Sequence, residues 1–192
     1  MKGSTYYCLF DEQSKYLRHV VAGKVVADLG CGDGTLSRAM VGMGASHVHA
    51  VDKAPFKIHG DSKITSHQTY FKDWVAAPHG IEVAVVCWPQ NNNLPGLVEI
   101  LSAIPHVVYV GKNTDGSACG NPGLHTYLAG RESVRCLPYP RNVLIHYGPE
   151  PRTDKSLHHE EFAAIDQYET RFFNSNEERR EPNSWLTKEN RP

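Results

Sequence analysis

Short apolar runs alternate with segments of helical periodicity along most of the chain. Five runs have the length and β-branched content of buried parallel strands, and they cover residues 25–29, 47–51, 64–70, 83–88 and 106–110. Apolar residues recur every three to four positions elsewhere, which predicts helices at residues 11–22, 35–42, 94–103 and 124–129. Strands that alternate with helices predict an α/β fold whose strands are mainly parallel.

The last third of the chain follows a different pattern. Two short strands are predicted at residues 133–137 and 143–147, and a short proline-containing segment joins them. Residues 148–154 contain two prolines and are expected to be a linker. An amphipathic helix is predicted at residues 156–173, before a polar tail. We therefore expect a domain over residues 1–150 and a C-terminal helix and tail over residues 151–192.

The glycine-rich loop after the first strand is the most informative segment. Gly30, Gly32 and Gly34 follow a buried strand and precede a helix, so the backbone N–H groups that open the helix form a potential ligand cradle. Asp52 ends the next strand about 20 residues after the loop, where a dinucleotide-binding unit places a ribose-binding acid. The alternatives are a purely structural turn and a nicotinamide or flavin site. The loop is shorter than the G-x-G-x-x-G of those sites, and no Tyr-x-x-x-Lys occurs.

Residues 28–34, Asp-Leu-Gly-Cys-Gly-Asp-Gly, closely resemble motif I of the class I S-adenosylmethionine-dependent methyltransferases. Val51-Asp52-Lys53 resembles the ribose-binding segment of that family. The resemblance implies a doubly wound, mostly parallel, seven-stranded Rossmann-like sheet with a terminal antiparallel strand pair. It also implies S-adenosylmethionine as cofactor. The cofactor-binding residues that it implies are Asp28, Gly30, Cys31, Gly32, Gly34, Asp52, Lys53, Asp73 and Trp74.

Each acid has a role that this resemblance implies. Asp52 is expected to accept hydrogen bonds from two ribose hydroxyls, since a carboxylate only accepts. Asp28 is expected either to organise the N–H groups of the loop or to meet the cofactor amine through water. Asp73 is expected to bind the adenine amino group, with Trp74 or a backbone N–H beside it, or else to be an exposed loop residue.

The segment Trp88-Pro89-Gln90-Asn91 stands where many amino-methyltransferases have Asp/Asn-Pro-Pro-aromatic. Only one proline matches, and Trp88 takes the first position of that motif. Gln90 or Asn91 can supply an amide carbonyl, so Trp88, Gln90 and Asn91 are the catalytic candidates. The alternative is a polar loop that caps the following helix. We expect the acceptor between this loop and residues 112–123, because both follow the carboxyl ends of central strands.

Composition limits the classes of partner and the kinds of site that the chain can be expected to have. The chain has 192 residues and a formal net charge of -1, which disfavours a protein whose affinity depends on many phosphate contacts. Its five cysteines are scattered without a C-x-x-C pair, as in reduced cytoplasmic proteins. No signal peptide or bilayer-spanning apolar run is visible. The cluster His158-His159-Glu160-Glu161 makes no complete ligand set, so no metal site is predicted.

These observations predict an S-adenosylmethionine-dependent methyltransferase that acts on a small-molecule or protein acceptor. Two alternatives remain open. One is a nucleic-acid amine methyltransferase. The partial match of residues 89–91 to the Asp/Asn-Pro-Pro-aromatic motif favours it, and the net charge disfavours it. The other is a protein that binds the cofactor without catalysing methyl transfer.

Overall fold

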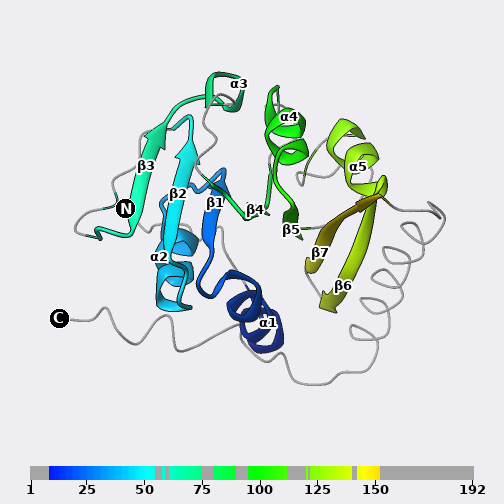
Figure 1. Ribbon diagram of the computed structural model, residues 1–192, viewed down its shortest axis with the longest axis horizontal. Helices are drawn as coiled ribbons and strands as arrows, with labels where there is room; N and C mark the ends of the chain where they lie inside the picture. The colour runs from blue at the N-terminus through cyan, green and yellow to red at the C-terminus, as the bar shows by residue number, and fades with distance from the viewer. Residues whose placement is uncertain are drawn as a thin grey trace, which may run out of the picture.

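The computed structural model describes residues 9–54, 58, 61–74, 80–89, 95–111, 120, 122–139 and 142–151. A seven-stranded sheet with the order β3-β2-β1-β4-β5-β7-β6 forms its centre (Figure 1). The strands are β1 (Val25–Leu29), β2 (His47–Asp52), β3 (Ile64–Gln68), β4 (Val83–Cys87), β5 (His106–Gly111), β6 (Arg131–Tyr139) and β7 (Asn142–Pro151).

The first five strands are parallel, and β7 pairs antiparallel with both β5 and β6. This arrangement confirms the predicted fold class, including the terminal antiparallel pair. Because β1 to β5 are parallel, the loops that follow them all leave the sheet at its carboxyl edge. The strand order reverses next to β1, which lies between β2 and β4. Ligands of open α/β sheets bind outside the carboxyl ends of the strands at such a point.

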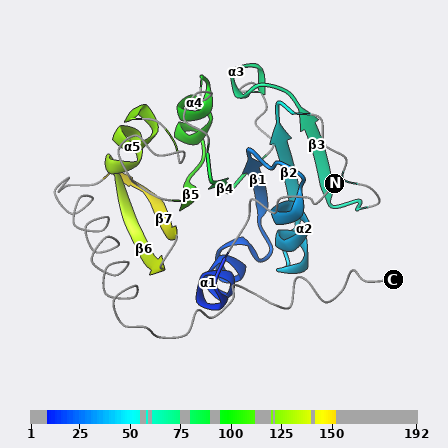
Figure 2. The same cartoon turned by 180° about the vertical axis from the view of Figure 1, so that it is seen from behind.

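Five helices surround the sheet in the described part of the chain (Figures 1 and 2). They are α1 (Asp11–Val21), α2 (Thr35–Gly42), α3 (Phe71–Trp74), α4 (Leu97–Ser102) and α5 (Pro122–Ala129). One apolar core joins α1 and α2 to one face of the sheet, through Leu17, Met40, Val26 and Val85. A second core joins α3, α4 and α5 to the other face. No helix within the described ranges is long and apolar enough to cross a bilayer.

The structure corrects two predicted boundaries of α4 and β3. Helix α4 begins at Leu97 and not at residue 94, and its N-cap Gly96 has a φ of 87°. A Cβ added to Gly96 would collide with the backbone of Lys72, so a close approach of α3 determines where α4 starts. Strand β3 ends at Gln68, two residues before the predicted end.

The predicted linker over residues 148–154 is wrong for its first half, because β7 continues to Pro151. Pairing with β5 ends at Tyr147, and the extension is paired only on its other side, where Pro151 lies opposite Arg131 of β6. A proline can occupy a strand where no neighbouring strand needs its missing N–H. The predicted helix at residues 156–173 and the tail lie outside the described residues.

Candidate functional site

A cavity of about 710 Å³ lies at the carboxyl edge of the sheet. Its walls come from four segments that are separate in the sequence: residues 28–33 at the end of β1, 52–54 at the end of β2, 69–72 after β3 and 86–89 at the end of β4. Leu36, Pro95 and Leu97 complete the lining. The cavity has the size of typical small-molecule sites, roughly 300–1,000 Å³, and it lies at the point where the strand order reverses.

The glycine loop folds back on β2 through two backbone hydrogen bonds. The N–H groups of Gly30 and Cys31 both donate to the carbonyl of Val51, at 2.8 and 3.1 Å. Gly30, Gly32 and Gly34 have φ values of 82°, 56° and 75°, in the left-handed region that glycine tolerates best. A Cβ added to Gly32 would have no protein atom within 4 Å, so Gly32 leaves open space at the cavity wall.

Gly34 has a different role from Gly32. It is the N-cap residue of α2, it does not line the cavity, and an added Cβ would collide with the side chain of Ile58. The sequence prediction treats the two glycines alike, whereas the structure assigns Gly34 to the turn and to packing.

Asp52 ties the loops together from the end of β2. Its Oδ2 accepts a hydrogen bond from the Gly32 N–H at 2.9 Å, and its Oδ1 accepts one from the Ala54 N–H at 2.8 Å. A carboxylate has about four lone-pair positions, so both oxygens can still accept from a ligand. Asp28 is the residue predicted to organise the N–H groups of the loop, whereas in the structure Asp52 accepts the Gly32 N–H.

Asp28 is buried between β1 and α2, with 1% of its surface exposed. Its Oδ2 accepts a hydrogen bond from the Ser37 hydroxyl at 2.6 Å. The pKa of Asp28 is raised to about 7, mainly by burial. The Ser37 hydrogen bond lowers this pKa, and the charges of Asp52 and Asp33 raise it. Burial together with the charges of Asp28 and Asp52 also raises the pKa of Cys31, so the thiol is protonated and a poor nucleophile at neutral pH.

Trp88 stands out at the cavity wall. It is the only non-glycine residue with a positive φ among the described residues, at 50°. Its backbone N–H donates to the carbonyl of Val110 at 2.8 Å, while its indole Nε1 is buried without a hydrogen-bond partner among the described residues. A bulky residue in the left-handed region is strained, and such strain concentrates at functional sites.

The structure brings most of the predicted site residues to the cavity. Those in its walls are Asp28, Gly30, Cys31, Gly32, Asp52, Lys53 and Trp88. Asp73 is exposed outside the lining, and Trp74 is buried in the core, where its ring packs against His49 and His67. Gln90 and Asn91 lie outside the described residues.

The sequence prediction misses Tyr70, Phe71 and Lys72, which line the cavity where Asp73 and Trp74 were expected. Tyr70 is 54% exposed, and the Lys72 Nζ lies 5.9 Å from the centroid of its ring. Asp73 is predicted because the family often carries an acid after this strand, whereas the structure brings residues 70–72 to the cavity. These three residues carry no motif, and only the end of β3 at Gln68 in the structure identifies them.

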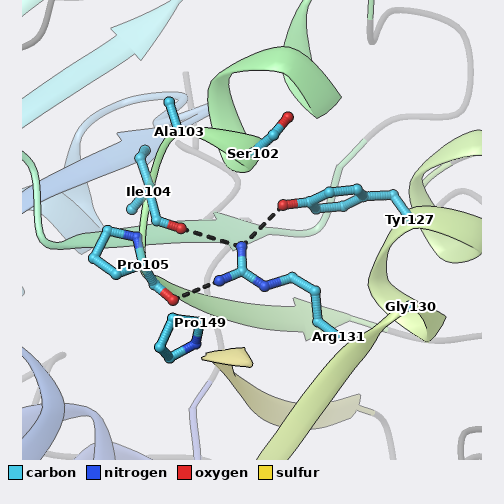
Figure 3. Close-up of a pocket in the computed structure, with 8 residues that line it drawn as sticks. All are labelled: Ser102, Ala103, Ile104, Pro105, Tyr127, Gly130, Arg131 and Pro149. Carbon is cyan, nitrogen blue, oxygen red and sulfur yellow. Dashed lines mark hydrogen bonds between the residues drawn. The ribbon is translucent and has the colours of Figure 1, made fainter. Parts of the chain in front are cut away.

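A second cavity, of about 410 Å³, lies near Arg131 at the end of α4 (Figure 3). Arg131 donates to the carbonyls of Leu101, Ile104, Pro105 and Gly148 and to the Tyr127 hydroxyl. A guanidinium has five N–H donors, and these partners occupy them, so Arg131 has no spare donor for an anion in this cavity. Within the described residues, no group of three or more His, Cys, Asp or Glu side chains could hold a metal ion.

Comparison with known proteins gives a structural match only. No protein-family model and no curated protein matches the chain. One similar solved structure is the Burkholderia thailandensis 1,6-didemethyltoxoflavin-N1-methyltransferase with bound 1,6-didemethyltoxoflavin and S-adenosylhomocysteine. It is 16% identical with a TM-score of 0.55, and the match covers 73% of this chain and 76% of that chain.

Two further structures extend this comparison. An S-adenosylmethionine-dependent methyltransferase from Mesorhizobium loti is 14% identical with a TM-score of 0.51, over 72% of this chain and 96% of that one. The ribosomal protein L11 methylase of Lactobacillus delbrueckii is 16% identical with a TM-score of 0.50, over 77% and 83%. The chain therefore has the fold of the class I S-adenosylmethionine-dependent methyltransferases.

Proposed function

We propose that this protein binds S-adenosylmethionine in the cavity at the carboxyl edge and transfers its methyl group to a small-molecule or protein acceptor. The observation that carries the proposal is the pairing of Gly32 with Asp52. Gly32 leaves open space at the wall, and Asp52 holds the loop while keeping lone pairs for a ligand. The methyltransferase fold supports the same assignment.

The residues of the cavity suit the parts of this cofactor. Asp52 would accept the two ribose hydroxyls, Gly32 would let the ligand approach the backbone, and Asp28 would face the amino group. Tyr70 and Phe71 would supply apolar and aromatic contacts for the adenine. Lys53 borders the same end of the cavity.

The cofactor supplies a methyl group that its sulfonium already activates for displacement. The protein then mainly has to align the acceptor with that methyl group, which is the contribution of proximity and orientation. Trp88 is the candidate for this role on the β4 side, because it lines the cavity with a strained backbone. Gln90 and Asn91 remain candidates for holding a polar edge of the acceptor.

Replacing Gly32 tests whether a ligand occupies the open space beside it. Gly32→Val should abolish binding of S-adenosylhomocysteine in isothermal titration calorimetry, because the branched side chain fills that space. Gly23→Val is the matched control, since Gly23 also has a left-handed φ, of 74°, and open space at its Cβ, but does not line the cavity. Normal affinity in a folded Gly32→Val protein would contradict the proposal.

The ribose assignment needs a test that separates Asp52 from the loop that it holds. Asp52→Asn should weaken S-adenosylhomocysteine by about 1–3 kcal/mol. The 2′,3′-dideoxy analogue of that ligand should be weakened much less. An equal loss for both ligands would assign Asp52 to loop structure alone.

Catalysis is tested with radiolabelled S-adenosylmethionine and fractionated lysate. Trp88→Ala and Asn91→Ala should keep cofactor binding and lose methyl transfer. Label that accumulates in nucleic acid would select the nucleic-acid alternative. Binding without transfer to any fraction would select the non-catalytic one.

A further inference from the structure

The hydrogen bond between Ser37 and Asp28 connects α2 to the wall of the cavity. Asp28 comes from β1, Ser37 from the first turn of α2, and the two side chains are 1% and 0% exposed. The distance from Ser37 Oγ to Asp28 Oδ2 is 2.6 Å, which lies in the range of hydrogen bonds between a hydroxyl and an ionised carboxylate, about 2.5–2.7 Å.

The charges that face Asp28 all oppose its ionisation. Asp52, at the end of β2, and Asp33, in the loop before α2, both raise the pKa of Asp28, and burial raises it more than either. The neighbouring Cys31 is a protonated thiol that adds no positive charge. Among the described residues, the Ser37 hydroxyl is the one group that favours the ionised form. A positively charged ligand group in the cavity would be the missing counter-charge.

We infer that Ser37 is a positioning residue that holds the Asp28 carboxylate toward a cationic ligand, so that cofactor binding at neutral pH is coupled to release of a proton from Asp28. The inference rests on the proposed function, because the ammonium group of the ligand is the cation concerned. The free protein carries the proton on Asp28 in a fraction of molecules. When the cation binds, Asp28 ionises, and the proton passes to the solvent.

The coupling predicts a specific pH profile. Below about pH 7, cofactor affinity should fall as the pH falls, by up to about tenfold per pH unit for one linked proton. Above about pH 7.5 the affinity should level off, because Asp28 is then ionised before the ligand arrives. Loss of the Ser37 hydroxyl should move this midpoint to a higher pH, since the group that favours the carboxylate is removed.

The experiment is calorimetric titration of the full-length protein with S-adenosylhomocysteine between pH 6 and 8.5. Titrations in two buffers with different ionisation enthalpies count the protons released. The wild-type protein should release a proton near pH 6.5 and almost none at pH 8.5. Ser37→Ala should bind several-fold more weakly at pH 7 and approach wild-type affinity at pH 8.5, and Ser37→Thr should restore the wild-type profile.

Two variants serve as references. Asp28→Asn should bind with a nearly flat pH profile and without proton release from this site. Ser14→Ala, which removes another buried helix hydroxyl that has no hydrogen-bond partner, should match the wild-type profile. It controls for the general effect of removing a buried hydroxyl.

Three results would overturn the inference in distinguishable ways. No binding by the wild-type protein at any pH would refute the proposed function itself. Binding with a flat pH profile and no proton release would leave the proposed function intact and refute the coupling. An equal loss of affinity at every pH in Ser37→Ala would assign Ser37 a structural role only.

Discussion

Asp28, in the interior strand β1, and Arg131, at the start of the edge strand β6, are both almost fully buried, 1% and 9% exposed. Arg131 holds together the end of α4, helix α5 and strand β7 through four carbonyls and one hydroxyl. Asp28 has one hydroxyl partner and two acidic neighbours. Both side chains are removed from water, yet the surrounding protein groups favour the charged form only for Arg131.

The difference separates a structural charge from a functional one. A buried charge is tolerated when its hydrogen bonds are satisfied. Arg131 meets this condition within the protein, so its cavity needs no ligand. Asp28 accepts from the Ser37 hydroxyl but faces two acids, and no cation among the described residues offsets its charge. It also lines the larger cavity, so a cationic ligand would complete its environment. Strongly perturbed acids in clefts are candidates for functional sites for this reason.

Removing the guanidinium should produce the largest change in stability. Arg131→Met should lower the free energy of unfolding by roughly 3–5 kcal/mol, because several buried acceptors lose their donors at once. Urea denaturation measures the loss. Binding of S-adenosylhomocysteine by the folded fraction should be unchanged. A loss below about 1 kcal/mol would show that water or rearrangement satisfies these acceptors.

Asp28→Asn should have the opposite effect on stability at alkaline pH. The folded-state pKa of Asp28 is raised from 3.8 to about 7, so the folded protein holds the proton more tightly than the unfolded chain. Its stability contribution is complete below about pH 4 and is lost as the pH rises through 7. At pH 8 the asparagine variant should therefore be more stable than wild type by about 2–4 kcal/mol, yet bind the cofactor more weakly. If wild type and Asp28→Asn had the same dependence of unfolding free energy on pH, the pKa of Asp28 would not be raised in the folded protein.

His146 is a third buried titratable group, and both of its ring nitrogens have a hydrogen-bonding neighbour. Its Nδ1 lies 3.0 Å from the Tyr16 hydroxyl and its Nε2 lies 3.1 Å from His106 Nδ1. Burial, together with the charges of His106, Arg131 and His19, lowers the pKa of His146 from 6.5 to about 4. The neutral form is therefore favoured in the folded state.

The sign of this effect is opposite to that of Asp28. Stability from neutral His146 is present above about pH 6.5 and is lost as the pH falls toward 4, because the unfolded chain binds the proton more readily. Wild type should lose roughly 1–2 kcal/mol between pH 7 and 5 from this group, and His146→Gln should lose less. Thermal unfolding across this pH range measures the difference. The same dependence of stability on pH in both proteins would show that His146 does not contribute to it.

The sequence predicts the segments where local chemistry decides the structure. Strand β1 and helix α2 begin and end where predicted, because apolar periodicity and the glycine turn act within about ten residues. Prediction from the sequence fails where contacts between distant residues determine the bounds of an element. Gly96 starts α4 because the backbone of Lys72 lies against it, and Pro149 and Pro151 remain in β7 because only β6 pairs with this extension.

The candidate site divides in the same way. The glycine loop and Asp52 carry a local motif, and the structure places them in one cavity wall. Ser37 carries no motif, since a serine in a helix is ordinary, and only its 2.6 Å contact with Asp28 identifies it. The partners of Arg131 lie up to 30 residues away, and most are backbone carbonyls, which a sequence pattern does not distinguish.

The variant with the smallest expected effect tests whether Arg131 has more hydrogen-bond acceptors than it needs. Its Nη1 donates to the Tyr127 hydroxyl at 2.9 Å and also to the carbonyls of Leu101 and Ile104, both at 3.1 Å. Nη1 carries two hydrogens, so three acceptors share two donors. Tyr127→Phe should therefore lower the free energy of unfolding by only about 0.5–1 kcal/mol, and the ring remains to pack beside the guanidinium. Urea denaturation beside Arg131→Met gives the comparison. A loss as large as that of Arg131→Met would mean that the two carbonyls do not satisfy Nη1, and that the contrast with Asp28 is one of degree.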